Sequence, residues 1–182
     1  QQVFVARNRE DAYEQQGSGL FCLHGARCHF DQMLVTANRT FGINVGGGEK
    51  TYASFRNLIV RDTLPQAADD KWGVGITIVE AVEGTFSKVG LRHNRDTGIY
   101  LMGPDVQVDI THLTVRDTAS NAHEFGRGGG VILQNGSSLT LRYADINGNH
   151  TTGLLAGNHP NEPFFAPPTV VASHITIRNT LP

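Results

Sequence analysis

One stretch of the chain reads GIYLMGPDVQVDITHLTVRDT, residues 98–118. A glycine opens it, and an alternating aliphatic run, a Gly-Pro-Asp turn and a second alternating run follow. Alternation of apolar and polar residues is typical of β-strands that bury one face and expose the other. The stretch therefore predicts short strands on both sides of a tight turn, which together form one coil of the chain.

The opening glycine recurs along the whole chain. Each copy precedes an aliphatic residue and an alternating run, and the copies are Gly19, Gly42, Gly75, Gly98, Gly130 and Gly153. The spacings between them are 23, 33, 23, 32 and 23 residues. A regular period indicates a repeat architecture, in which each unit buries its apolar face against its neighbours. Short and long spacings alternate, so the repeating unit is a pair of coils.

Apolar residues occupy the same slots in every coil. The opening run offers two inward positions per coil, which are Leu20 and Cys22, Ile43 and Val45, Ile76 and Ile78, Ile99 and Leu101, Val131 and Leu133, and Leu154 and Ala156. The second run adds further inward positions, as in Val108, Ile110, Leu113 and Val115. Coils this short leave no room for a helix of ordinary length. The sequence therefore predicts a single all-β domain over residues 1–182, a solenoid of about six to seven coils.

Two kinds of turn close the coils. Short coils end with an aliphatic residue, two residues, an Asn, three residues and a Gly, and the Asn position holds Asn38, Asn94 and Asn149. Asn tolerates the left-handed backbone of a tight turn, and its amide can bond the Asn of a neighbouring coil. Long coils instead continue into the loops 62–74 and 117–129. Both loops leave the same corner of alternate coils, so we expect them to project side by side.

The inward slots, the Asn turn and the glycine-aliphatic opening resemble the right-handed parallel β-helix repeat proteins of the pectin-lyase-like superfold. The resemblance covers essentially the whole chain and implies a right-handed solenoid, which is also the usual hand of parallel crossovers. The last residues, Thr180-Leu181-Pro182, match Thr63-Leu64-Pro65 at the start of a long loop. We therefore expect a segment of a longer solenoid, or one whose open ends pair with another copy.

The resemblance also implies that an active-site cleft would lie on the strand face beneath the long loops. The outward positions of that face are Phe21, Leu23, Asn44, Thr77, Val79, Tyr100, Met102, Ile132, Gln134 and Leu155. They include neither the paired acids of the superfold's hydrolases nor the acids and the Arg or Lys base of its lyases. Glycoside hydrolysis needs two carboxylates roughly 5–10 Å apart. The face instead predicts a surface that the loops or another chain cover.

The long loops carry the residues with the most chemistry. A carbohydrate-binding ridge would combine stacking aromatic rings with acids and bases, and the candidates are Tyr13, Asp69, Asp70, Trp72, Tyr100, His123, Glu124 and Arg127. In the alternative, the loops are only solvated and Trp72 folds back over the strand beside it. If the chain is an enzyme, the candidate catalytic residues are Asp117, His123, Glu124 and Arg127.

Metal and thiol chemistry depends on two short segments. Asp69 and Asp70 could hold calcium with neighbouring carbonyl groups, but no calcium-loop spacing is present, so we expect no cofactor. Cys22 and Cys28 lie near histidines, yet the repeat turns both thiols inward and His29 outward, so no structural zinc is expected. The cysteines fit either two buried thiols or a disulfide, if their Cα atoms lie within about 7 Å. Export of the protein would favour the disulfide.

The composition limits the partners. The formal net charge is −2, without the basic excess of a nucleic-acid binder, and no apolar run approaches the length of a bilayer span. We therefore expect a non-catalytic segment of an exported or cell-surface protein, whose loop ridge recognises a glycan or another surface protein. A polysaccharide-active lyase, hydrolase or epimerase of the same superfold is the alternative. Self-association through the open ends is a third hypothesis.

Overall fold

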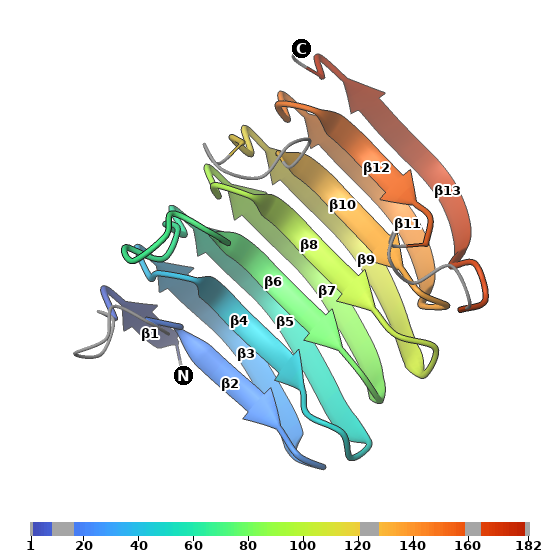
Figure 1. Cartoon of the computed structure of the whole chain (residues 1–182), viewed down its shortest axis with the longest axis horizontal. Helices are drawn as coiled ribbons and strands as arrows, with labels where there is room; N and C mark the ends of the chain where they lie inside the picture. Colours follow the sequence, from blue (N-terminus) through green and yellow to red (C-terminus); the bar gives the residue numbers. More distant parts are fainter. Residues whose placement is uncertain (1, 9–16, 121–127, 159–164, 181–182) are drawn as a thin grey trace.

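The computed structural model describes residues 2–8, 17–120, 128–158 and 165–180. These residues form thirteen β-strands, and none of them lies in a helix that could cross a membrane. Odd-numbered strands build one sheet and even-numbered strands the other, as Figure 1 shows. The strands are β1 (Val3–Ala6), β2 (Leu20–Leu23), β3 (Arg27–Thr36), β4 (Phe41–Gly46), β5 (Thr51–Arg61), β6 (Val74–Val79), β7 (Val82–Arg92), β8 (Thr97–Met102), β9 (Val106–Arg116), β10 (Gly129–Gln134), β11 (Ser138–Asn147), β12 (Thr152–Ala156) and β13 (Thr169–Arg178).

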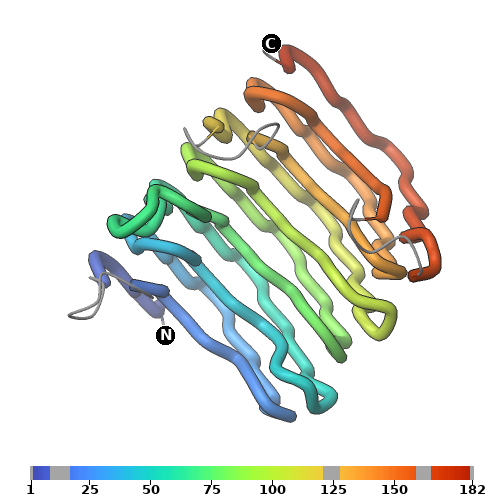
Figure 2. Tube along the Cα trace, viewed as in Figure 1, coloured from blue at the N-terminus to red at the C-terminus, as the bar shows by residue number. Residues whose placement is uncertain are grey.

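All strand pairing is parallel, and each strand pairs with the strand two places further along the chain. The odd-numbered strands run in the order β1-β3-β5-β7-β9-β11-β13, and the even-numbered strands form a six-stranded sheet in the same way. Each coil therefore contributes one strand to each sheet. Figure 2 shows these coils stacked from the N-terminus to the C-terminus. The predicted all-β parallel solenoid is confirmed, and seven and six strands match the expected number of coils.

The inward slots fall in register from coil to coil. In the six-stranded sheet Ile43 pairs with Ile76, and neither side chain is more than 1% exposed. In the seven-stranded sheet the ring of Phe55 stacks between Phe30, at 5.6 Å, and Phe86, at 5.2 Å. The core therefore consists of columns of similar side chains, because every coil presents the same slot at the same register.

The long strands of the seven-stranded sheet bend once, at a single residue. The residue at the bend has left-handed backbone in each of these strands, and these residues are Gln32, Asn57, Lys88, His112, Tyr143 and His174. In β9, His112 has a φ of 59° and separates Ile110 from Leu113, which are both 1% exposed. A left-handed residue redirects the chain without a loop. Each long strand thus has two halves that both contribute to the core.

The Asn ladder is present, but its geometry differs from the expectation. The left-handed residue of each short-coil turn precedes the Asn, and these residues are Ala37, His93 and Gly148. The Asn side chains are at most 1% exposed. Their Oδ1 atoms accept backbone N–H groups of the preceding coil, from Asn8 to Asn38 at 3.1 Å, from Thr63 to Asn94 at 3.2 Å and from Thr118 to Asn149 at 3.3 Å. The expected left-handed Asn and amide-to-amide bond are therefore wrong, because the inward amide satisfies a buried backbone donor instead.

Packing, rather than backbone freedom, explains the glycine column. A Cβ atom on Gly98 would lie 2.5 Å from the carbonyl oxygen of Gly130 and 2.6 Å from Cγ1 of Val115. On Gly42 it would lie 2.6 Å from the carbonyl oxygen of Gly75. Neighbouring coils approach too closely here for any side chain, which is a recurrent reason for glycine inside strands.

Cys22 and Cys28 form a disulfide, and their Cα atoms are 6.2 Å apart. Cys22 belongs to β2 and Cys28 to β3, so the bond crosses the turn that joins the two sheets. The sulfur of Cys22 occupies an inward slot of the core, next to that of Val45. The disulfide therefore links the two strands on either side of one turn in the first complete coil.

Candidate functional site

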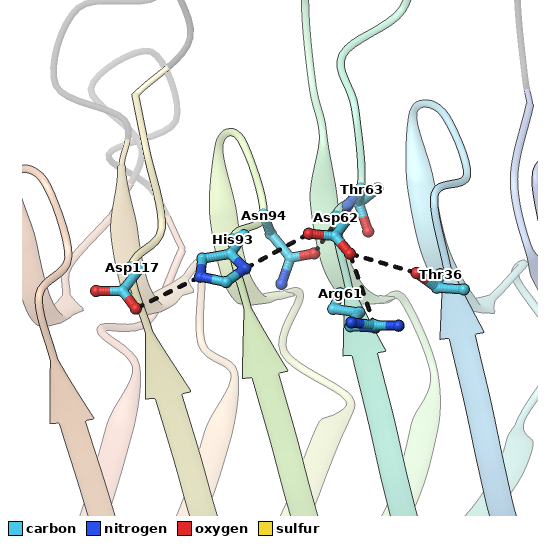
Figure 3. A network of polar contacts seen from close by, with 7 residues as sticks. All are labelled: Thr36, Arg61, Asp62, Thr63, His93, Asn94 and Asp117. Carbon is cyan, nitrogen blue, oxygen red and sulfur yellow. Dashed lines mark hydrogen bonds and ion pairs between the residues drawn. The ribbon is translucent and has the colours of Figure 1, made fainter.

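Three polar side chains line up at the corner from which the long loops leave. Asp62, His93 and Asp117 directly follow the last residues of β5, β7 and β9, and those last residues pair with one another in register. The three side chains therefore occupy the same corner of consecutive coils. Figure 3 shows them in a row, which we call the corner column.

The backbone beneath the corner column is fixed by the buried ladder. Asp62, His93 and Asp117 have left-handed φ angles of 56°, 53° and 55°. The next residue in each coil turns inward, and the N–H group of Thr63 donates to Oδ1 of Asn94 at 3.2 Å. An exposed row of side chains thus rests on a turn whose hydrogen bonds are buried.

Within the column, His93 lies between two carboxylates. Its Nδ1 atom is 3.5 Å from Oδ1 of Asp62, and its Nε2 atom is 3.6 Å from Oδ2 of Asp117. The side chains of Asp62, His93 and Asp117 are 41%, 61% and 59% exposed. Polar contacts between side chains this exposed contribute little to stability. The three groups are therefore open to a ligand.

Asp62 has two further neighbours that extend the column. The hydroxyl group of Thr36 donates to Oδ2 of Asp62 at 3.4 Å, and Nε of Arg61 lies 3.7 Å from the same oxygen. Thr36 belongs to β3, so side chains of four successive coils meet along this edge, as Figure 3 shows. The edge presents hydrogen-bond donors and acceptors side by side.

Arginines end several of the long strands next to the column. Nη2 of Arg116 lies 2.7 Å from Oδ2 of Asp145, and Nη2 of Arg178 lies 3.4 Å from Oδ1 of the same carboxylate. Arg92 is exposed, and within the described part of the chain its side chain has no hydrogen bond or ion pair. The positive charges on this edge are thus partly neutralised by neighbouring acids.

The loop 62–74 contains three of the predicted ligand-binding residues. Oδ1 of Asp69 accepts the backbone N–H of Lys71 at 3.2 Å, and its Oδ2 lies 3.0 Å from Nζ of Lys71. Asp70 has left-handed backbone, with a φ of 57°. The ring of Trp72 lies 5.6 Å from that of Phe41, at the start of β4. Trp72 therefore folds back over a strand of the neighbouring coil.

The remaining predicted residues lie in different places. Tyr100 is on the outward face of β8, and its hydroxyl group donates to Oε1 of Gln134 at 2.7 Å. Asp117 belongs to the corner column. Tyr13, His123, Glu124 and Arg127 lie outside the described residues.

The outward face of the six-stranded sheet differs between its centre and its ends. Thr77 and Ile132, on inner strands, are each 5% exposed. Phe21 and Leu155, on the outermost strands, are 46% and 45% exposed. Other outward residues of the inner strands, such as Asn44, Tyr100 and Gln134, are half-buried, so exposure of this face increases toward its two ends.

Among the described residues, no group of three or more His, Cys, Asp and Glu side chains is arranged to hold a metal ion. The corner column spreads its three groups along a line. The carboxylate of Asp69 already contacts Lys71, and the sulfur atoms of Cys22 and Cys28 are bonded to each other.

A second polar cluster lies where the long strands begin. The guanidinium carbon of Arg27 is 4.3 Å from the ring centroid of Tyr52, and Nζ of Lys50 is 5.4 Å from it. Nζ of Lys50 also lies 2.9 Å from Oε2 of Glu83. The hydrogen bond to Glu83 and its negative charge raise the pKa of Lys50 above its ordinary value. Lys50 therefore remains positively charged beside the aromatic ring.

Sequence reasoning identified both acids of the corner column as the starts of long loops, but it missed His93. A signal for His93 was present. His93 precedes Asn94 as Asp62 precedes Thr63 and as Asp117 precedes Thr118. An alignment of the coils on the position before the ladder would have placed all three side chains at one corner.

Comparison with known proteins gives one match. A family model described as "Right handed beta helix region" matches residues 42–181, a stretch that includes the whole corner column. Neither the curated proteins nor the solved structures yielded a match to this chain.

Proposed function

Because the chain belongs to the right-handed β-helix family, we propose that it is a non-catalytic recognition segment that binds glycans along the corner column. The observation that carries the proposal is the row of exposed polar groups of Asp62, His93 and Asp117 on three consecutive coils. Their backbone is fixed by buried hydrogen bonds. A rigid row of this kind binds a ligand with little loss of side-chain and loop entropy.

The chemistry of the column suits the hydroxyl groups of a sugar chain. A carboxylate accepts several hydrogen bonds, and an imidazole both donates and accepts. Successive coils are about 4.8 Å apart, which is close to the length of one sugar residue in an extended chain. Asp62, His93 and Asp117 could therefore each contact a successive sugar residue.

The disulfide supports the compartment that this function requires. Bonds such as the one between Cys22 and Cys28 form and persist in oxidising surroundings, which include the cell exterior and the periplasm. Export would bring the corner column to extracellular glycans.

The first test is a binding experiment. We expect the chain to bind at least one neutral oligosaccharide on an array of xylan, glucan, mannan and galactan fragments. Hydrogen bonds to charged groups contribute about 1.5–3 kcal/mol each. The double variant Asp62→Ala/Asp117→Ala should therefore bind that oligosaccharide at least about tenfold more weakly in calorimetric titration.

The matched control is Asp105→Ala, because Asp105 is also an exposed acid but lies in the turn between β8 and β9. This variant should bind like the wild type. Recognition at the corner column would be contradicted if no oligosaccharide on the array bound, or if the control and the double variant lost equal affinity.

A catalytic role is the second candidate, and one observation favours it. Asp62 and Asp117 lie on opposite sides of His93, and paired carboxylates are the usual acid and base of glycan cleavage. In this case the chain would release reducing ends, or unsaturated ends that absorb ultraviolet light, from acidic or neutral polysaccharides. His93→Ala and Asp117→Ala would then each abolish the product, whereas Asp105→Ala would not.

A further inference from the structure

A trough lies on the outer face of the seven-stranded sheet, along the first halves of the long strands. It has a volume of about 320 Å³. Hydroxyl groups, two arginines, one histidine and one aspartate line it, and the residues used below are His29, Arg56, Ser87, Asp109, Thr111 and Arg142. The second halves of the same strands separate this trough from the corner column, which follows their ends.

The register of the strands shapes the trough. Arg56, Ser87, Thr111 and Arg142 occupy one outward column on β5, β7, β9 and β11. Two short hydroxyl side chains thus lie between two long arginines. This part of the column therefore has a low centre between two guanidinium groups, and Asp31 on β3 and Ser173 on β13 continue it on either side.

The two arginines are available to a ligand. Arg56 and Arg142 are exposed, and among the described residues neither guanidinium group has a hydrogen bond or an ion pair. Three strand spacings separate them, which is about 14 Å. A guanidinium group binds carboxylate and sulfate groups through paired hydrogen bonds. The column is therefore suited to a molecule with two negative groups at a comparable separation.

The centre of the trough is lined by hydroxyl groups and a carboxylate rather than by positive charges. The hydroxyl groups of Ser87 and Thr111 both donate and accept hydrogen bonds, and the carboxylate of Asp109 accepts them. Asp109 lies in the neighbouring outward column, in the same register as His29 but three strands away from it. Its charge disfavours a negative group at the centre. The ligand should therefore carry hydroxyl groups between its two anionic ends.

We propose that this trough binds an anionic oligosaccharide, with its acidic groups on Arg56 and Arg142 and its hydroxyl groups on the side chains between them. The acidic group is a carboxylate or a sulfate ester, because both fit a guanidinium fork. This site is independent of the corner column, since it uses different residues and a charged class of ligand.

The test uses the intact chain and three probes in calorimetric titration. The probes are a trigalacturonate, which carries only carboxylates, a heparin-derived tetrasaccharide, which also carries sulfate esters, and neutral maltotetraose. We expect at least one acidic probe to bind and maltotetraose not to compete with it. The stronger acidic probe identifies the preferred anionic group. The double variant Arg56→Ala/Arg142→Ala should weaken that binding at least about tenfold, with an unchanged melting temperature.

Two controls locate the effect. Arg92→Ala removes another exposed arginine with an unpaired side chain, from a different column, and it should leave the affinity unchanged. Asp62→Ala/Asp117→Ala should also leave it unchanged, so failure of the corner column and failure of the trough are distinguishable. The proposal is overturned if neither acidic probe binds, if maltotetraose competes equally, or if either control loses as much affinity as the double arginine variant.

Discussion

Replacing Phe55 with Ala is expected to lower the free energy of unfolding by about 4 kcal/mol. Phe55 is 1% exposed, and its ring is stacked between those of Phe30 and Phe86 on the two neighbouring coils. The substitution removes buried apolar surface and leaves a cavity between two rings that are held by their own strands. Collapse of that cavity would require the strands themselves to move, so little of the loss can be recovered.

Urea unfolding followed by circular dichroism measures this effect. Phe55→Leu keeps most of the volume and should cost only about 1 kcal/mol. Phe4→Ala should change stability by less than about 0.5 kcal/mol, because Phe4 is 66% exposed. A loss below about 1 kcal/mol for Phe55→Ala would mean that the stacked rings do not belong to a close-packed core.

Replacing Gly98 with Ala is expected to cost about 3 kcal/mol of unfolding free energy. The new methyl group would lie 2.5 Å from the carbonyl oxygen of Gly130. That oxygen belongs to the backbone of the next coil, so it cannot rotate away as a side chain would. The two coils must separate locally, which weakens the parallel hydrogen bonds on both sides.

Gly90→Ala is the matched control for Gly98→Ala. Gly90 also lies inside a strand, β7, but the nearest atom to an added methyl group is Cγ1 of Ile59 at 3.9 Å. Alanine loses less backbone entropy on folding than glycine, so this variant should be neutral or slightly more stable. Both variants are compared in the same urea titrations, and equal losses in the two would contradict the packing explanation of the glycine column.

The sequence was sufficient for the fold because each coil repeats its constraints. Ile99 and Leu101 alternate with outward residues, and Gly98 directly precedes this alternating run. Both signals, the alternation and the glycine, recur in every coil, so an error in one coil would have been exposed by the others. Register followed directly, since a shift by one residue would turn the apolar side chains to the outside.

The bend of the long strands was harder to predict, although the sequence contains its trace. Inward residues in β9 are spaced by two, except that Ile110 and Leu113 are three apart. This irregular step is where His112 adopts left-handed backbone. The outward residues at the bend include His, Tyr, Lys and Gln as well as Asn. Residue type therefore did not predict the left-handed backbone at the bend, because the stacking of the coils rather than local preference imposes this conformation.

The Asn turns failed for a related reason. Local preference assigns left-handed backbone to Asn, but in the second short coil this conformation falls on His93 and leaves Asn94 to point inward. The buried N–H group of Thr63 needs an acceptor, and the amide of Asn94 supplies it. The competing requirement comes from another coil, so it could not be recognised within a single turn.

Some residues of the candidate sites were identified from the sequence, whereas others were recognised only from the stacking of the coils. Asp117 was identified from the sequence because it begins a long loop. His93 was recognised as a site residue only from its contacts with Asp62 and Asp117 on adjacent coils. Arg56 and Arg142 are 86 residues apart in the numbering, and only the register of four strands places them in one column. Sites on a solenoid are built across coils, so a reading along the chain separates their members.

The alternating ladder also restricts how such a chain can change its length during evolution. From Asn38 to Asn149 the buried ladder position alternates between Asn and Thr, and we call the coils Asn coils and Thr coils accordingly. Where a Thr coil is followed by an Asn coil, the Asn side chain accepts the backbone N–H group of the Thr. Where a coil with Asn is followed by a coil with Thr, the backbone carbonyl of the Asn accepts the N–H group of the next coil instead, as from Leu64 to Asn38 and from Ala119 to Asn94.

Loss of one coil would place two Asn coils or two Thr coils next to each other, so the regular alternation of the two contacts would be interrupted there. Loss or duplication of two coils would preserve both kinds of contact. Growth in pairs would also add a loop to the same edge each time, so that a longer descendant would extend its row of loops along that edge.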